Sequence, residues 1–136
     1  MQGEVPVCCT PQGSDREDVD EVFELLNAYR VSQGIDALAY DPVLEEAMQG
    51  HCKHMDQADF FAHESPVREL TTPWDRAEIC GTSANAENIA AGQNSPAAVM
   101  DGWRNSSGHD RNMRSTGSSR VGIGKYGRYW GQIFGR

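Results

Sequence analysis

The chain has 136 residues, which is enough for one domain built around a single hydrophobic core. Its formal net charge is -8, and it contains only 12 basic side chains. An acidic chain without a cluster of lysine and arginine repels phosphate backbones, which argues against nucleic acid as the main partner. No apolar run approaches the roughly eighteen residues that a membrane-spanning helix needs, so we expect no transmembrane segment.

The first residues differ in character from the rest. Residues 1–13 contain two prolines and two glycines and have no hydrophobic period, so they predict an extended arm that is ordered only if its cysteines tie it down. The start, MQGEVPVCC, has neither the basic residues nor the apolar core of a secretory signal peptide, and we expect the mature part of a secreted chain. Residues 14–136 are predicted to form the single domain.

Four helices are predicted in chain order. Ser14 followed by Glu17 predicts a capping box at the start of a helix over residues 15–33, and Gly34 ends it. Three further helices are announced by an N-cap residue followed by proline, at Asp41–Pro42, Thr72–Pro73 and Ser95–Pro96. We expect them to run to about Ala58, Gly81 and Trp103.

The end of the chain changes to the period of a β-strand. Residues 119–126 and 129–134 enclose Gly127–Arg128, which suits a two-residue hairpin turn with glycine first. Residues 86–91 are too short for a helix and predict a strand or a turn beside that hairpin. Because helices come first and strands mostly late, the sequence favours a layered α+β domain over a parallel βαβ sheet.

The four cysteines form no CxxC pair, and an even number in a small loop-rich chain indicates disulfides and an oxidising compartment. Adjacent Cys8 and Cys9 cannot pair with each other without backbone strain. We therefore predict a long-range Cys52–Cys80 disulfide and leave the partners of Cys8 and Cys9 open.

Three polar residues are candidates for a site. Glu87 lies among small and apolar residues of a predicted core strand, so its carboxylate must be paired, line a cleft, or be a buried acid bonded to backbone amides. His63 follows two phenylalanines and is either a turn residue or a buried ring that needs a partner. His109 follows Gly108 in a predicted loop that can aim its imidazole into a cleft.

Other polar and aromatic residues fit structural roles better. His51 and His54 lie one helical turn apart, which can support a metal pair but more often gives one core-edge and one solvent-facing residue. Arg30 is predicted to form an ion pair or carbonyl contacts beside the sheet. The tryptophans are predicted to anchor the core or a cleft wall, at Trp74, Trp103 and Trp130.

Six blocks of sequence in this order resemble the CAP superfamily, also called SCP or pathogenesis-related-1-like, in its bacterial secreted branch. The blocks are NAYR (27–30), LAYDPVLEEAM (38–48), FAHESP (61–66), AENIAAG (86–92), the segment from Trp103 to His109, and VGIG followed by YWGQIFG. The resemblance spans about residues 19–135. It implies a three-layer α-β-α sandwich with a central antiparallel sheet.

The resemblance also implies a central cleft lined by two histidines and two acids, which in some members binds a divalent metal such as zinc. By motif match, His63, Glu87 and His109 correspond to three of the four. The fourth position, usually glutamate in eukaryotic members, is Ser106 here. Ser106, which could bond to His109 or to a bound water, and Asn88, which lies beside Glu87, are accessory candidates in the cleft.

Three functions are compatible with this pattern. We expect a secreted, monomeric, non-enzymatic binding module for a lipid, cell-wall or protein ligand, because the sequence has no nucleophile elbow and no HExxH motif. One alternative is a zinc-dependent hydrolase or protease in which His63, Glu87 and His109 hold the metal and a water. The other is a structural adhesion module in which the same residues form a satisfied polar core.

Overall fold

The computed structural model describes residues 4–136. The residues of the predicted arm before Glu4 lie outside the described part. The elements are the α-helices α1 (Ser14–Ser32), α2 (Pro42–Ala58), α3 (Pro73–Cys80), α4 (Pro96–Arg104) and α5 (Ser107–Met113), the 3-10 helix η1 (Arg68–Leu70), and the strands β1 (Ala39–Tyr40), β2 (Ala86–Ala91), β3 (Arg120–Tyr126) and β4 (Tyr129–Gly135).

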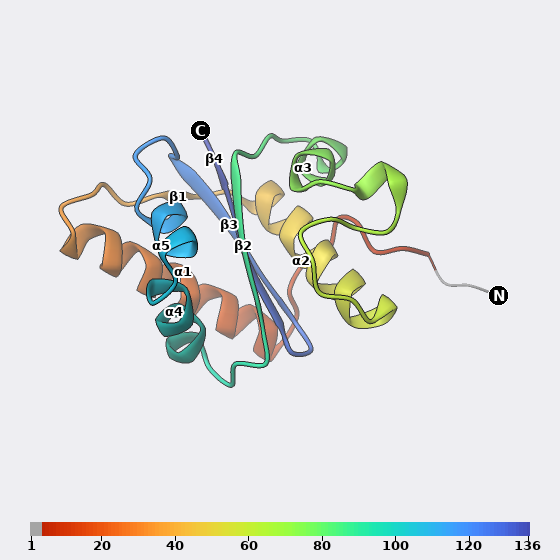
Figure 1. The fold of residues 1–136 in the computed structure, drawn as a ribbon, viewed down its shortest axis with the longest axis horizontal. Helices are drawn as coiled ribbons and strands as arrows, with labels where there is room; N and C mark the ends of the chain where they lie inside the picture. Colours follow the sequence, from red (N-terminus) through yellow and green to blue (C-terminus); the bar gives the residue numbers. More distant parts are fainter. Residues whose placement is uncertain (1–3) are drawn as a thin grey trace.

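The four strands form one sheet in the order β1-β3-β4-β2. The predicted hairpin is β3 and β4, which pair antiparallel around Gly127 and Arg128, and β2 pairs antiparallel with β4 from Ala86↔Phe134 to Ala91↔Tyr129. Helices α1, α4 and α5 cover one face of the sheet and α2 and α3 cover the other (Figure 1). The three-layer α-β-α sandwich is therefore confirmed.

One strand was not predicted. β1 has two residues and pairs parallel with β3, so the sheet is antiparallel except at this edge. Two residues are too few to carry a period, and the pairing depends on the tertiary position of β3. The antiparallel description of the sheet holds for the three longer strands.

Both faces of the sheet are buried because helices cover each of them. Every residue of β4 is buried, and its alternating side chains enter two separate cores. Trp130 and Phe134 pack with the α1 and α4 side, whereas Ile133 packs with the α2 side. Gly122 allows α2 to approach the sheet, since a Cβ atom at this position would lie 2.1 Å from the backbone nitrogen of Glu45.

The helix starts follow the predicted signals except at α1. Asp41 caps α2 by accepting from the amides of Val43 and Leu44, Ser95 caps α4, and Thr72 with Asp75 forms a capping box at α3. At α1 the predicted capping box is wrong: Gly13 is the N-cap, no side chain caps the helix, and Ser14 is already helical. The positive φ of Gly13, 55°, turns the arm into the helix one residue earlier than the serine signal indicated.

The predicted Cys52–Cys80 disulfide is also wrong. Cys80 is bonded to Cys8, whereas Cys9 and Cys52 are free. Cys52 lies on the buried face of α2 and is part of the core between this helix and the sheet, whereas Cys8 of the arm takes the place predicted for it beside Cys80. Sequence separation alone does not show which face of a helix a cysteine occupies.

The disulfide ties the extended arm to the domain. The amide of Cys9 donates to the carbonyl of Glu46 at 3.0 Å. Val7 lies directly against Gly50 of α2, where a Cβ atom would come within 1.8 Å of the Val7 carbonyl oxygen. This close approach places Cys8 beside Cys80. The arm is held to the domain by one of its cysteines, as predicted.

Candidate functional site

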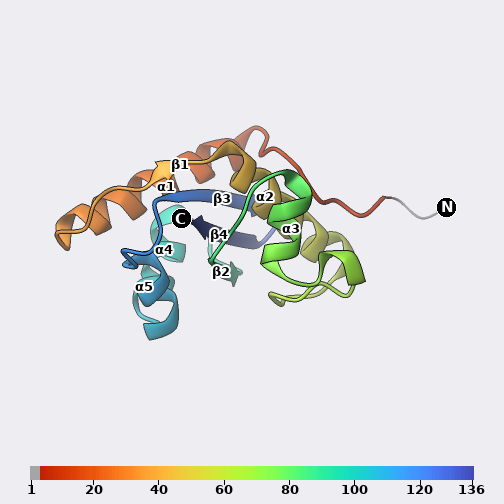
Figure 2. The same cartoon turned by 90° about the horizontal axis from the view of Figure 1, so that it is seen from above.

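A hollow of about 380 Å³ lies where β2, the edge strand of the sheet, meets the start of α3 and the chain between α2 and α3. We call it the β2 cleft and define it by its lining residues His63, Glu64, Thr72, Pro73, Trp74, Asn85, Ala86, Glu87 and Asn112. Figure 2 shows α5 and the segment between α2 and α3 extending from the sheet on the same side of the molecule. Two other hollows of about 360 and 420 Å³ contain neither histidine nor tryptophan.

Glu87 is the central residue of the cleft. Its side chain is 1% exposed and lies on the α2 and α3 face of β2, as does that of Ile89 two residues later. Its Oε1 is 2.8 Å from Nδ1 of His63, and its Oε2 accepts from Nη2 of Arg76 at 3.1 Å. The carboxylate is thus paired on both oxygens, which distinguishes it from a buried acid held by backbone amides.

The hydrogen bond to Glu87 raises the pKa of His63 above its ordinary value of 6.5 and outweighs partial burial, which lowers it. The His63 side chain is 46% exposed, so the rest of its ring faces the cleft and the solvent. Its orientation is set by the bond at Nδ1, and Nε2 is left for a ligand.

Sequence reasoning missed Arg76. This residue of α3 is 1% exposed, and its Nη1 donates to the carbonyls of Leu70 at 2.8 Å and Thr71 at 3.3 Å. It therefore binds the η1 turn and Glu87 at the same time. A signal was present, because Arg76 follows Pro73 by three residues and precedes Ala77, which places it on the buried stripe of a short helix.

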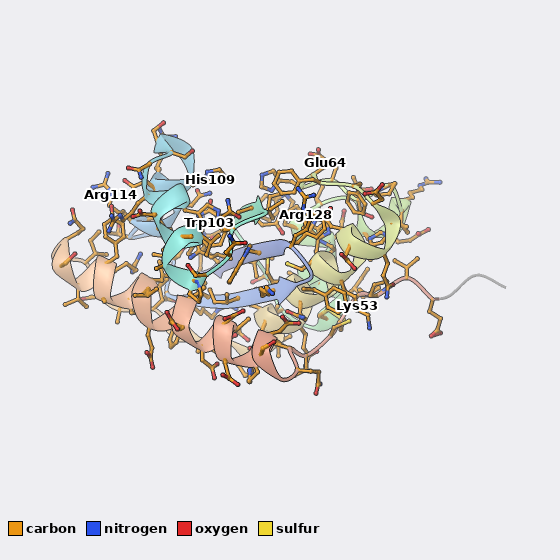
Figure 3. All side chains as sticks on the ribbon, turned by 90° about the horizontal axis from the view of Figure 1, so that it is seen from below. Lys53, Glu64, Trp103, His109, Arg114 and Arg128 are labelled. Carbon is orange, nitrogen blue, oxygen red and sulfur yellow. A yellow bond between two sulfur atoms is a disulfide. The ribbon has the colours of Figure 1, made fainter. Side chains whose placement is uncertain are left out.

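His109 lies on α5, and the predicted loop around it is wrong. Seven residues, Ser107–Met113, are too few to show a helical period. Nδ1 of His109 is 2.9 Å from the hydroxyl of Ser106. Figure 3 shows His109 and Glu64 projecting toward the same side of the molecule from opposite sides of β2.

Asn88 is fully buried, and its amide donates to the carbonyl of His109 at 3.0 Å and to Oε1 of Gln132 at 3.0 Å. Its Oδ1 accepts from Nδ2 of Asn112 at 2.9 Å. Asn88 therefore joins α5 to the sheet through His109 and Asn112.

Of the three predicted site residues, Glu87 and His63 are hydrogen-bonded to each other, and His109 lies apart from this pair. Glu87 contacts His63 and Arg76, whereas no hydrogen bond joins Glu87 to the side chain of His109 in the described part of the chain. Burial lowers the pKa of His109, and the positive charge of His63 lowers it further, so the two imidazoles lie within electrostatic range.

The donor set bears on the predicted zinc site. Within residues 4–136, no three His, Cys, Asp or Glu side chains are grouped so that they could hold a metal ion. Both oxygens of Glu87 are engaged by Arg76 and His63, which makes Glu87 an orienting carboxylate and not a third ligand. Of the predicted donors, His63 and His109 each engage Nδ1 and keep Nε2 without a partner among the described residues.

His51 and His54 are both buried, at 1% and 4% exposure, so the expectation that one of them faces solvent is wrong. Nε2 of His51 is 2.8 Å from the carbonyl of Ala62, and burial lowers the pKa of His51 to about 4. His54 faces Ser65, whose hydroxyl is 3.4 Å from its Nδ1. These two rings pack beneath the segment that carries His63.

The three tryptophans differ in burial, and Arg30 has the role that the sequence predicted. Trp103 and Trp130 are each 1% exposed, whereas Trp74 is 44% exposed and lines the β2 cleft. Trp103 also donates to the carbonyl of Ile89 at 3.2 Å, which occupies a backbone acceptor of the edge strand. Arg30 makes the predicted carbonyl contacts, to Asp36, Met113 and Ser115.

The α-β-α sandwich is the fold of CAP or SCP domains. The profile described as "CAP: Cysteine-rich secretory protein family" matches residues 23–133. The chain therefore belongs to the CAP family.

Relatives and solved structures agree with this assignment. The uncharacterized protein YkwD of Bacillus subtilis (strain 168) is 34% identical over 118 residues, which are 84% of this chain and 45% of that protein. An extracellular protein containing an SCP domain from Bacillus anthracis str. Ames superposes with a TM-score of 0.86 at 31% identity, over 90% of this chain and 41% of that one.

The fold alone is shared with an outer surface protein from Borrelia burgdorferi, with a TM-score of 0.80 at 20% identity over 89% of this chain and 93% of that one. The chain spans under half the length of YkwD and of the Bacillus anthracis protein. The Bacillus anthracis protein is described as extracellular, and the Borrelia burgdorferi protein is described as an outer surface protein. No helix within residues 4–136 combines the length and the apolar character needed to cross a bilayer.

Proposed function

We propose that the chain is a secreted, monomeric, non-enzymatic binding module whose ligand occupies the β2 cleft. The observation that carries this proposal is the chain of contacts from Arg76 through Glu87 to His63, which fixes one imidazole at a hollow with an exposed tryptophan. A buried ion pair contributes little net stability compared with apolar packing, so its position beneath a cleft favours a role in orienting a binding group.

Of the three ligand classes expected from the sequence, a cell-wall fragment fits the cleft best. The lining is mixed, with His63, Glu64 and Asn112 beside one aromatic side chain, Trp74. A lipid chain needs a mainly apolar wall along its length, and a protein partner usually needs a broader surface than one hollow. The extracellular description of the Bacillus anthracis relative places that protein where cell-wall fragments occur.

Calorimetric titration of soluble peptidoglycan fragments into the purified protein tests the proposal. We expect saturable binding to the wild type and at least tenfold weaker binding to the variant with His63→Ala and His109→Ala, with circular dichroism unchanged. A matched control is Glu78→Ala on the exposed side of α3. Equal binding by the double variant and the wild type would place the ligand outside the cleft.

A divalent metal between His63, which lines the cleft, and His109 on α5 is a second candidate. It is favoured by the way each histidine uses Nδ1, His63 toward Glu87 and His109 toward Ser106, because metal-bound histidines commonly anchor one ring nitrogen in this way. A bound zinc ion would supply a Lewis acid between the imidazoles. Zinc titration of chelator-treated protein, monitored by NMR of the imidazole nitrogens, tests metal binding. The absence of any shift in these signals would rule out the metal.

The same variants separate the two remaining alternatives. A zinc-dependent hydrolase requires turnover of a peptide or ester by the zinc-loaded wild type and its loss when His63 and His109 are replaced. A structural adhesion module requires that the double replacement unfold the protein whether or not metal is present.

A further inference from the structure

We propose that the ligand of the β2 cleft is a neutral saccharide whose ring stacks on Trp74. This inference rests on the proposed binding function and names the ligand class. It starts from the exposure of one tryptophan, since Trp74 is 44% exposed while the other two are 1% exposed. A solvent-facing indole in a hollow is a flat apolar surface that contributes little to the core.

The local structure holds Trp74 in place. It is the second residue of α3, directly after Pro73, and the capping box between Thr72 and Asp75 fixes the first turn of this helix. Cys80, at the other end of the same helix, is bonded to Cys8. The indole is therefore presented by a short helix that is restrained at both ends, so little backbone entropy is lost when a ligand binds.

Polar groups with unused hydrogen-bonding capacity surround this indole. His63 uses only Nδ1, toward Glu87, and the exposed Glu64 side chain has no partner among the described residues. Asn112 donates through Nδ2 to Asn88 and to the carbonyl of Glu87, which leaves its Oδ1 as an acceptor. The indole of Trp74 can stack on the apolar face of a pyranose. The ring nitrogen of His63, the carboxylate of Glu64 and the amide oxygen of Asn112 can form hydrogen bonds with its hydroxyl groups.

The charge of the cleft favours a neutral contact group over an anionic one. Among residues 4–136 no lysine or arginine lines the hollow, and the nearby Arg76 is buried and bonded to Glu87. Glu64 adds a negative charge at the rim. A phosphate or a carboxylate would therefore be repelled by Glu64, and the positive charge that His63 can carry is already paired with Glu87. A neutral sugar meets no such repulsion.

The volume is adequate for such a ligand. The cleft holds about 380 Å³, within the range of about 300 to 1,000 Å³ typical of small-molecule sites. An organic cation would also be attracted to an indole beside a carboxylate, because the ring face is electron-rich. The test therefore includes a cation as a competing probe.

The experiment is a fluorescence titration with tri-N-acetylchitotriose. Because Trp103 and Trp130 are buried, acrylamide quenching reports mainly on Trp74. We expect the trisaccharide to protect Trp74 from acrylamide and to shift its emission, with saturation, while tetramethylammonium has no effect at the same concentrations. Trp74→Ala should weaken trisaccharide binding, measured by calorimetry, at least tenfold.

Ile79→Ala is the matched control, since Ile79 is 52% exposed on the same helix but does not line the cleft. Its affinity should equal that of the wild type, and the unfolding midpoints of both variants show whether each is folded. Undiminished binding by Trp74→Ala overturns the saccharide proposal, as does protection by tetramethylammonium alone. If peptidoglycan fragments bind but trisaccharides do not, the ligand class is wrong and the proposed function stands.

Discussion

Arg76 and Glu87 form a buried ion pair, with Nη2 of the arginine donating to Oε2 of the glutamate at 3.1 Å and both side chains no more than 2% exposed. The pair joins α3 to the edge strand β2. The second oxygen of the same carboxylate orients His63. One buried contact thus connects the packing of α3 with the geometry of the cleft.

Replacing Arg76 should be strongly destabilising. Arg76→Ala would leave the Glu87 carboxylate buried without its cation and two carbonyls without their donor, so we expect a loss of about 3–5 kcal/mol in the free energy of unfolding. Urea unfolding measures this loss. Glu78→Ala, exposed on the same helix, is the control and should change the free energy by less than about 0.5 kcal/mol.

The pair of Glu87 and His63 predicts the titration of His63. Because the hydrogen bond to Glu87 raises the pKa of His63, Glu87→Gln should lower that pKa, as measured from the imidazole signals by NMR. The contribution of this pair to stability is fully present below the pKa of unfolded histidine and is lost as pH rises through the higher folded value. An unchanged His63 pKa in this variant would contradict the orienting role of Glu87.

His51 should make the protein sensitive to acid. Its pKa is lowered from 6.5 to about 4 by burial, so the unfolded state binds a proton more readily as pH falls through this window. The expected loss of stability between about pH 6.5 and pH 4 is roughly 3 kcal/mol. His51→Gln should flatten the pH dependence of urea unfolding in this range. If the stability of His51→Gln fell with pH as steeply as that of the wild type, His51 would not be the source of the acid sensitivity.

The disulfide between Cys8 and Cys80 should stabilise the domain by closing a long loop. With a sequence separation of 72 between the two cysteines, chain entropy predicts a loss of about 4 kcal/mol when Cys8→Ser and Cys80→Ser are combined. Cys9→Ser should have little effect, because Cys9 is free and only partly buried. Mass mapping that found Cys80 joined to Cys52 or Cys9 would contradict this pairing.

The contact between Val7 and Gly50 predicts a matched pair of glycine variants. Gly50→Ala would place a Cβ atom 1.8 Å from the Val7 carbonyl oxygen, so we expect the arm to be displaced at a cost of about 1–3 kcal/mol. Gly108→Ala on α5 meets no atom within 4 Å and should be neutral or slightly stabilising. Hydrogen exchange at Cys9, whose amide donates to Glu46, reports the displacement. Equal effects of the two variants would contradict the packing of the arm.

Local signals predicted much of the fold. The N-cap and proline pairs at Asp41, Thr72 and Ser95 begin three helices as expected, because capping is decided within a few residues. The hairpin turn at Gly127 followed from the same local chemistry. β1 and α5 were missed because two and seven residues carry too little period.

The sequence context singled out His63, Glu87 and His109 one by one, but only the resemblance to a family grouped them in one cleft. His63, Glu87 and His109 come from three separate segments, and composition or spacing does not show that Glu87 contacts His63 while His109 lies on another layer. Arg76 belongs to no motif, and its role appears only when α3 packs on β2. The cysteine pairing failed for a similar reason, since the buried face of α2 was needed to exclude Cys52.

In the proposed function, the ligand occupies the β2 cleft beside His63. The most direct measurement is an NMR titration of the protein with soluble peptidoglycan fragments, following the ring signals of His63 and Trp74 together with those of Tyr29, which lines the hollow between α1 and α4. We predict saturable shifts at His63 and Trp74 and none at Tyr29. Shifts confined to Tyr29, or none at any ring, would contradict binding in the β2 cleft.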